Sequence, residues 1–216
     1  MRALLGYVYR DMVRGQRWVA PLVCFAALDA ILSAQTGSVL PTFAVTATGL
    51  LFIGTWLTVV IVNNEDPVQQ AITEACARSR SRVRLSKLLF AYLVIAALGI
   101  VGTIGPPIAS SSGVTLEELS AGVCAQLITA LAAVALGALC SRPIIRRRAW
   151  SVLLGVTVCL ATVIVPSGPP TRQLLVLYNK TGSFALGVPI ALIALETVVL
   201  GAVAIAVSLR LSLRRS

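Results

Sequence analysis

The chain has 216 residues, of which 57% are hydrophobic and only 12% are charged, and its formal net charge is +10. A water-soluble domain of this length needs far more polar surface, so the composition excludes an ordinary soluble protein. It predicts an all-α membrane protein with one transmembrane domain over residues 1–216. Histidine is absent and the five cysteines form no CxxC pair. We therefore expect no metal site, no disulfide framework and no enzyme.

The N-terminal segment, MRALLGYVYRDMVRGQR (residues 1–17), has the pattern of an amphipathic helix. Five apolar residues share one face of the helical wheel: Met1, Leu4, Leu5, Val8 and Met12. The other face carries Arg10, Asp11, Arg14 and Arg17, which predicts a helix lying in the membrane interface. A cleaved signal peptide is the alternative interpretation, but Asp29 interrupts the apolar stretch that it would need.

Six apolar segments follow, and we expect each to cross the membrane because a spanning helix needs about 20 mostly apolar residues. They are Trp18–Ala34, Thr42–Val62, Leu88–Ile108, Ser120–Cys140, Trp150–Val165 and Phe184–Leu209. The fifth is the shortest.

All Lys and Arg residues except Arg172 and Lys180 lie on one side of this topology. The positive-inside rule therefore predicts a multi-pass protein of the cell membrane with both termini in the cytoplasm. Because the basic charge is explained by topology, we do not expect nucleic-acid binding.

A polar loop over residues 64–87, containing EDPVQQAITEACARSRSRVRLSK, separates the second and third apolar segments. Asp66, Pro67 and Gln69 have the spacing of an N-cap, a first helical residue and the third residue of a capping box. Five apolar residues then form one helical stripe: Val68, Ala71, Ile72, Ala75 and Cys76. The pattern predicts a helix of about eleven residues, roughly 16 Å long. Arginines follow up to Lys87, where we expect the third span to begin.

Two kinds of surface could hold this helix, a layer of lipid headgroups or a groove in a partner protein. Anionic lipids would attract the arginines, but they would repel Glu65, Asp66 and Glu74. A capped helix that is acidic at one end and basic at the other fits a protein groove better. We therefore favour docking to a protein partner, with anionic lipids as a further partner of the basic residues.

The segment at 166–183 is the longest of the three expected to lie outside the membrane. PSGPP at 166–170 ends the fifth apolar segment, and TRQLLVLYNK follows. Residues 171–178 are too few to span a membrane and too apolar for a free loop. They predict a short re-entrant or interfacial segment between the fifth and sixth spans.

This arrangement resembles the permeases of the type-2 class of ABC exporters. The resemblance covers the interfacial N-terminal helix, the six spans and the acid-led helical loop after the second span. Glu65, Ile72, Arg80 and Lys87 match the acidic residue, the short helix, the Arg-containing turn and the Lys that opens the third span in that family. The chain lacks the Gly that usually follows the acidic residue and the Pro that precedes the Arg turn. Its compact size is also similar to the membrane subunit of haem exporters, although the absence of histidine argues against haem handling.

The resemblance implies that the loop helix is a coupling helix on a separate ATPase. The implied coupling residues are Glu65, Asp66, Gln69, Ile72, Arg80, Arg82 and Lys87. The chain has no GxxxxGK[ST] motif, so the resemblance places ATP and Mg²⁺ on a P-loop ATPase subunit and implies no cofactor in this chain. Six spans are half of the usual transport unit, which implies a second permease copy or a paralogue as a further partner.

Three residues within the apolar segments are candidates for a substrate path: Asp29, Trp56 and Glu196. A carboxylate in the hydrocarbon core costs several kcal/mol, so Asp29 and Glu196 should face a cavity, a partner or the protein interior. Their expected depths are similar enough for one shared polar site. The alternative is that each is a protonated, hydrogen-bonded structural residue and that Trp56 packs in the core.

Three functions remain open at this point. The first is the permease subunit of an ATP-driven exporter, for which the scarcity of interior charge favours an amphiphilic cargo. The second is a secondary transporter or channel-like subunit that uses Asp29 and Glu196. The third is a membrane scaffold that tethers a cytoplasmic partner through the helix at 65–87.

Overall fold

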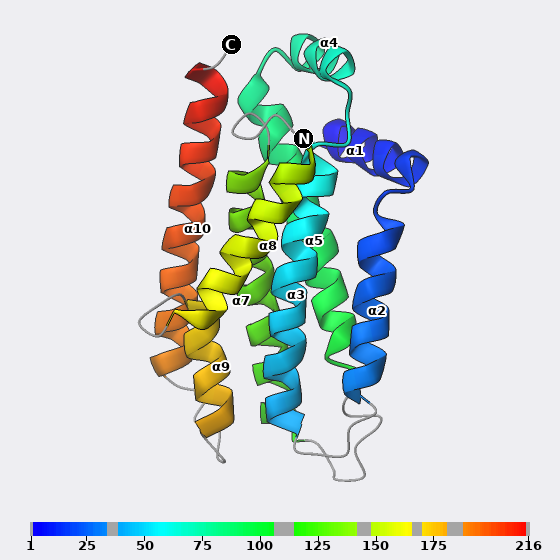
Figure 1. Ribbon diagram of the computed structural model, residues 1–216. Helices are drawn as coiled ribbons and strands as arrows, with labels where there is room; N and C mark the ends of the chain where they lie inside the picture. The colour runs from blue at the N-terminus through cyan, green and yellow to red at the C-terminus, as the bar shows by residue number, and fades with distance from the viewer. Residues whose placement is uncertain are drawn as a thin grey trace.

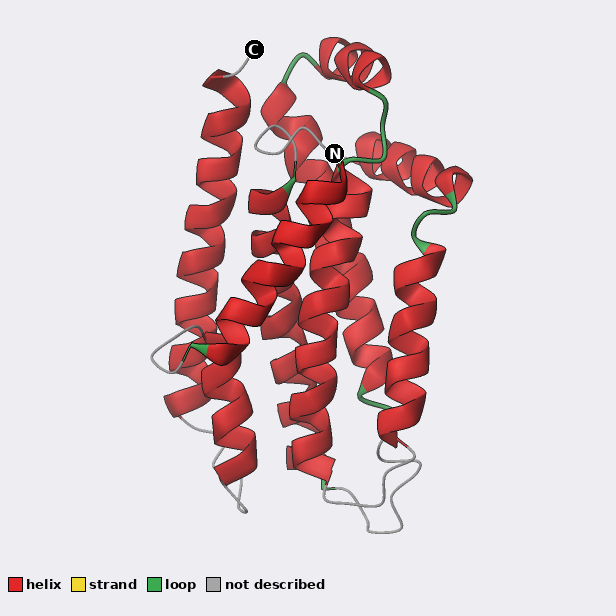
Figure 2. Cartoon of the chain, in the orientation of Figure 1, coloured by secondary structure: helices red, strands yellow, loops and turns green. Residues whose placement is uncertain are grey.

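The computed structural model describes residues 2–33, 39–105, 115–141, 148–165, 170–180 and 188–214. Within these ranges every regular element is a helix (Figure 2). The helices are α1 (Arg2–Gly15), α2 (Val19–Ser33), α3 (Val39–Val62), α4 (Pro67–Ala77), α5 (Arg80–Gly102), α7 (Leu116–Cys140), α8 (Arg148–Ile164), α9 (Pro170–Lys180) and α10 (Val188–Arg214). The all-α prediction is confirmed for this part of the chain.

Four of these helices, α3, α5, α7 and α10, are long and apolar enough to cross a membrane. Helices α1 and α2 meet the same criteria only as a pair, which is bent by 82°. Helix α8 is apolar but has 17 residues, and α2 has 15, so the first span rather than the fifth has the shortest described helix. Helices thus lie in all six predicted ranges, while length and composition support four or five crossings. This is compatible with a multi-pass membrane protein.

The third predicted span begins earlier than the sequence suggested. Helix α5 starts at Arg80 instead of Leu88, because Ser79 is an N-cap whose hydroxyl accepts a hydrogen bond from the backbone N–H of Arg82 at 3.4 Å. The basic run before Lys87 is therefore helical. The predicted ends at Ala34 and 106–108, and the predicted start at 184–187, lie outside the described residues.

Helix α3 occupies the centre of the bundle and contacts α2, α5, α7, α8 and α9 (Figure 1). Its Phe43, Leu50 and Leu51 side chains have no exposed surface. The α3–α7 contact is the most extensive, because Gly137 of α7 lets the two helices approach closely. A Cβ atom at Gly137 would lie 2.5 Å from the Cβ of Thr58. Helix α3 is therefore the central helix of the bundle, and α7 is its closest neighbour.

One end of the bundle carries α1, α4 and the last turns of α10 (Figure 1). Helix α1 lies across this end, nearly perpendicular to α2, and α4 projects beyond it. Both described termini, Arg2 and Arg214, lie at this end, while α9 lies toward the opposite end. Helix α1, helix α4 and the two described termini therefore lie together at one end of the bundle.

Candidate functional site

Helix α4 has the limits that its sequence predicts, but its N-terminus is capped differently. Asp66 is the N-cap, with φ −68° and ψ 148°, and Pro67 is the first helical residue of an eleven-residue helix. The Asp66 side chain makes no capping hydrogen bond. Gln69, expected to complete a capping box, instead donates from Nε2 to Tyr7 Oη at 2.8 Å. The prediction of a capping box is therefore wrong. Gln69 instead connects α4 to α1.

The apolar stripe of α4 faces away from the bundle. Val68 and Ile72 are 69% and 61% exposed, and Ala71, Ala75 and Cys76 are also exposed. An open groove of about 580 Å³ lies beside the stripe. Tyr7 of α1 lines this groove together with Asp66, Val68, Gln69, Ile72, Thr73 and Cys76. The helix thus presents its apolar face outward, which is typical of a surface that binds a partner.

Glu65 and Lys87 form a buried ion pair where the loop meets the bundle. Lys87 Nζ lies 2.9 Å from Glu65 Oε2, and the two side chains are 4% and 2% exposed. Glu65 follows α3, and Lys87 lies in the third turn of α5. These two predicted coupling residues therefore face each other inside the protein. Their pairing ties the chain just before α4 to α5 and presents no charge to a partner.

Arg80 and Arg82 lie on the first turn of α5 and are exposed. Arg80 Nε lies 3.0 Å from Glu74 Oε2, which joins the start of α5 to α4. Glu74 Oε1 also accepts a hydrogen bond from Gln70 Nε2 at 2.8 Å. Five of the seven predicted coupling residues are therefore placed on or near α4 with exposed or partly exposed side chains: Asp66, Gln69, Ile72, Arg80 and Arg82.

Helix α1 is docked on the protein as well as amphipathic, which sequence reasoning missed. Asn64 Nδ2 donates to Asp11 Oδ2 at 2.7 Å and to the Asp11 carbonyl at 3.2 Å. Val8 is buried, and the Tyr9 ring meets Phe90 edge to face at 6.4 Å. The two tyrosines on α1 were a signal, since each has an apolar body and a hydroxyl that can reach a partner.

Arg84 is a second residue that sequence reasoning missed. Its guanidinium donates to the Ala138 carbonyl and to Ser141 Oγ, both at 3.3 Å, and to Ser208 Oγ at 2.5 Å. It therefore joins α5 to the ends of α7 and α10. The alternating arginines looked like one exposed basic run. A helix that begins at Arg80 instead turns Arg84 toward the bundle.

The three candidate path residues lie apart. Asp29 is on α2 and Glu196 is on α10, and these helices occupy opposite sides of the bundle (Figure 1). The expectation that both carboxylates share one polar site within the chain is therefore wrong. Trp56 is half-buried on the central helix α3.

The two carboxylates also have different surroundings. Asp29 Oδ1 is buried and has no hydrogen-bond partner among the described residues. It lies beside Gly102 of α5, where an added Cβ would be 3.3 Å from this oxygen. Glu196 is exposed and accepts a hydrogen bond from Gln173 Nε2 of α9 at 3.3 Å. Each carboxylate therefore belongs to a separate local environment.

Within the described ranges, no three Cys, Asp or Glu side chains are grouped so that they could hold a metal ion. The candidate site consists of the exposed α4 stripe and the buried contacts that fix α4 and α1 to the bundle. In comparisons with known proteins, no protein-family model matches the chain and no curated protein matches it significantly.

Proposed function

We propose that the chain is the membrane-spanning permease subunit of an ATP-driven ABC exporter. A separate P-loop ATPase would hydrolyse ATP with Mg²⁺, and this chain would couple hydrolysis to export of an amphiphilic substrate. In the proposed topology α2, α3, α5, α7, α8 and α10 cross the cell membrane, and both termini are cytoplasmic. Helix α9 is the re-entrant or interfacial segment, and a second copy or a paralogue completes the transport unit.

The observation that carries this proposal is the combination of an exposed apolar face on α4 with a stiff connection behind it. A helix that transmits force from a partner needs a free surface to bind and a connection that does not yield. Val68 and Ile72 provide the surface, and complete burial of such a side chain contributes about 1.5–3 kcal/mol. The Glu65–Lys87 pair provides the connection, because it is enclosed and joins the start of α4 to α5.

A second connection runs from α4 to α1. Tyr7 Oη accepts hydrogen bonds from Gln69 Nε2 at 2.8 Å and from Thr73 Oγ1 at 3.5 Å. Because α1 continues into α2 through a bend, a displacement of α4 reaches the start of the first span as well as α5. One docking helix would thus move both neighbouring spans.

The test measures ATP hydrolysis that purifies with the tagged chain from its native membrane in a mild detergent. Ile72→Asp places a charge in the proposed interface, and we expect it to reduce vanadate-sensitive hydrolysis per mole of chain at least tenfold. Leu116→Asp is the matched control, because Leu116 is 85% exposed and lies at the start of α7, away from α4. It should leave the hydrolysis unchanged.

Asp66→Lys is a second variant, which reverses the exposed charge at the start of α4 while leaving the buried Glu65 intact. It should also reduce the hydrolysis that purifies with the chain. The proposal fails if the wild-type chain carries no ATP hydrolysis after chemical cross-linking in the membrane. It also fails if Ile72→Asp keeps the wild-type level of hydrolysis, as the control Leu116→Asp is expected to do.

A secondary transporter is the second candidate, and the surroundings of Asp29 favour it. A carboxylate oxygen that is buried without a hydrogen-bond partner among the described residues is a reasonable place for a proton to bind. A proton-coupled carrier would transport substrate under a proton gradient without ATP, and Asp29→Asn would abolish that dependence. An exporter would require ATP in the same vesicles, while a scaffold would bind its partner without transport.

A further inference from the structure

Helix α1 is held against the end of the bundle with a defined side toward each neighbour. Tyr7 Oη accepts a hydrogen bond from Gln69 Nε2 of α4 at 2.8 Å, so the Tyr7 side faces the helix that projects beyond the bundle (Figure 1). The Tyr9 ring meets Phe90 edge to face, and Phe90 lies ten residues beyond the start of α5. The Tyr9 side of α1 therefore faces back along the bundle. Because α1 makes an angle of 82° with α2, it lies along the membrane surface in the proposed topology.

The one acidic residue of α1 faces the protein, whereas two of its arginines face away. Asp11 Oδ2 accepts a hydrogen bond from Asn64 Nδ2 at 2.7 Å. Gly15 approaches the same side chain, since a Cβ atom there would lie 2.9 Å from Asn64 Oδ1. Arg10 and Arg14 are exposed and lie one helical turn apart, so they form one row. The fold thus separates the acid of α1 from the outward arginines.

Three exposed arginines have no ion-pair partner among the residues that the structure describes: Arg10, Arg14 and Arg17. Arg17 lies in the bend between α1 and α2. The ion pairs found within the described ranges join α4 to α5 and the preceding loop to α5. Each guanidinium has five N–H donors, which suit the oxygens of a phosphate. The outer edge of α1 is therefore a row of positive charge with free donors.

An exposed apolar row lies next to the basic row. Tyr9 and Val13 are one turn apart and are 56% and 42% exposed. Val13 is three residues from Arg10, so the two rows are neighbours on the helix surface. The apolar row is on the side that faces back along the bundle, where the Tyr9 ring meets Phe90. Apolar residues toward the hydrocarbon and arginines at its edge are typical of a helix that lies on a lipid surface.

Two tryptophans lie near the same end of the bundle as this edge. Trp18 directly precedes α2, and Trp150 is the third residue of α8 and is 56% exposed. Helix α8 begins at the end that carries α1 (Figure 1). Tryptophan is enriched at the boundary between membrane and water, so α1 lies near that boundary. Helix α4 projects beyond α1, and so does the corner between α4 and α5, where Arg78 and Arg82 are exposed.

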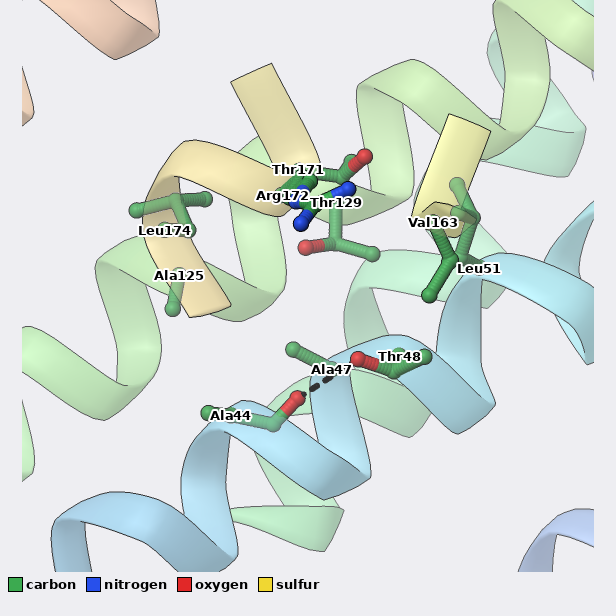
Figure 3. Close-up of a pocket in the computed structure, with 10 residues that line it drawn as sticks. All are labelled: Ala44, Ala47, Thr48, Leu51, Ala125, Thr129, Val163, Thr171, Arg172 and Leu174. Carbon is green, nitrogen blue, oxygen red and sulfur yellow. Dashed lines mark hydrogen bonds between the residues drawn. The ribbon is translucent and has the colours of Figure 1, made fainter. Parts of the chain in front are cut away.

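Arg172 of α9 gives a contrast, because it also has no carboxylate partner among the described residues. Its Nη1 donates to the Ile164 carbonyl. Arg172 lines a small cavity together with Thr129 and Thr171 (Figure 3). The cavity measures about 20 Å³, which is enough for about one water molecule. A phospholipid headgroup does not fit there, whereas the arginines of α1 are open to their surroundings.

We propose that α1 binds a layer of anionic phospholipid. Arg10, Arg14 and Arg17 donate hydrogen bonds to headgroup phosphates, and Tyr9 and Val13 rest against the acyl chains. The charges are complementary, and each arginine near an anionic membrane strengthens binding roughly fivefold. The inference requires that the bundle crosses a membrane, but it does not depend on ATP-driven export, because the chain binds the lipid without an ATPase.

The experiment uses the purified full-length chain in phosphatidylcholine vesicles, without ATP or a partner protein. Val13→Cys carries a bimane fluorophore, and nitroxide-labelled phosphatidylglycerol or phosphatidylcholine is the quencher. The exposed Cys24 and Cys76 are replaced by Ala, and the same chain with Val13 unchanged measures background labelling. At low salt, the apparent affinity for phosphatidylglycerol should exceed that for phosphatidylcholine about tenfold or more. This preference should fall in about 1 M salt, because the Debye length is then only about 3 Å.

Two double variants that remove the same charge locate the contact. Arg10→Gln with Arg14→Gln should lower the preference for phosphatidylglycerol about fivefold or more. Arg78→Gln with Arg82→Gln is the matched control, since these exposed arginines are also four residues apart but lie at the corner between α4 and α5. It should keep the wild-type preference. Arg10→Lys with Arg14→Lys retains the charge and should retain most of the preference, which separates the effect of charge from a loss of folding.

Four results would overturn the proposal. The first is that neither lipid quenches the fluorophore, since α1 would then not lie on the membrane. The second is equal quenching by both lipids in the wild-type chain, which would leave the arginines to a protein partner. The third is a preference that survives Arg10→Gln with Arg14→Gln. The fourth is an equal loss in the two Gln double variants, which would make the preference an effect of net charge. None of these results concerns ATP hydrolysis, so the proposed function is tested separately.

Discussion

Glu65 and Lys87 have opposite charges that water cannot reach, so each depends on the other. Removing one partner of a buried pair leaves an uncompensated charge and costs about 3–5 kcal/mol. We therefore expect Glu65→Gln to lower the free energy of unfolding, measured by SDS titration in micelles, by several kcal/mol. The double variant Glu65→Leu with Lys87→Met should recover most of that loss, because it removes both charges.

The Glu74–Arg80 pair provides a control for this prediction, since Arg80 is 47% exposed. An exposed ion pair contributes about 0–1 kcal/mol, so Glu74→Gln should change the free energy of unfolding by no more than that. Equal effects of Glu65→Gln and Glu74→Gln would contradict the structural role of the buried pair.

The sequence located the start of the loop helix more reliably than it located the contacts of the residues around that helix. Asp66 and Pro67 define the start of α4 because an N-cap and a first-turn proline act locally. Glu65 and Lys87 lie 22 residues apart, and their pairing depends on how α3 and α5 pack side by side. Arg84 likewise depends on the positions of Ser141 and Ser208 in other helices. Such contacts are tertiary, so residue types and local spacing do not reveal them.

At the scale of helices, the α3–α7 contact depends on the absence of a side chain at Gly137. A Cβ there would lie 2.5 Å from Thr58 Cβ and 3.1 Å from the Thr55 carbonyl oxygen, and a backbone atom cannot easily move away. Gly137→Ala should therefore lower the free energy of unfolding by about 1–3 kcal/mol, the usual cost of overpacking. Thermal or SDS denaturation of the purified chain measures this change.

Gly201→Ala is the control, because its Cβ would make ordinary contacts at 3.5 Å with Leu131. It should be close to neutral. If Gly137→Ala is as stable as Gly201→Ala, then α3 and α7 are not packed as closely as the structure shows.

The positions of the helices were predictable, because long apolar runs and the 3.6-residue period carry that information in the sequence. Their limits were less predictable where charged residues continue a helix. Arg80 to Lys87 looked like a basic loop, yet the helix begins at Arg80 because Ser79 caps it. The docking of α1 through Tyr7 and Asn64 was also missed, since a helical wheel shows an apolar face without showing what covers it.

For the whole molecule, the grouping of α1, α4 and both termini at one end makes the topology testable. Cys76 is exposed on α4, and Leu116 is exposed at the start of α7, away from α4. In intact cells, a membrane-impermeant maleimide should label Leu116→Cys and should spare Cys76. Cys24 is replaced by Ala in this experiment, because it is also exposed.

After permeabilisation, Cys76 should react as well, which shows that it is accessible in the folded protein. Labelling of Cys76 before permeabilisation would reverse the proposed orientation. In that case the α4 stripe would face away from any cytoplasmic ATPase, and the proposed function would fail with the topology.

The central position of α3 also has a consequence for biosynthesis. Among the described helices with extensive contacts to α3, α2 precedes it in the chain, whereas α5, α7, α8 and α9 are made later. Phe43, Leu50 and Leu51 therefore leave the ribosome long before the residues that cover them. A nascent chain that stops after α5 still lacks α7, the helix that makes the most extensive contact with α3. The bundle therefore closes around α3 late in translation, and a chain that ends before α7 leaves the buried residues of α3 without their main cover.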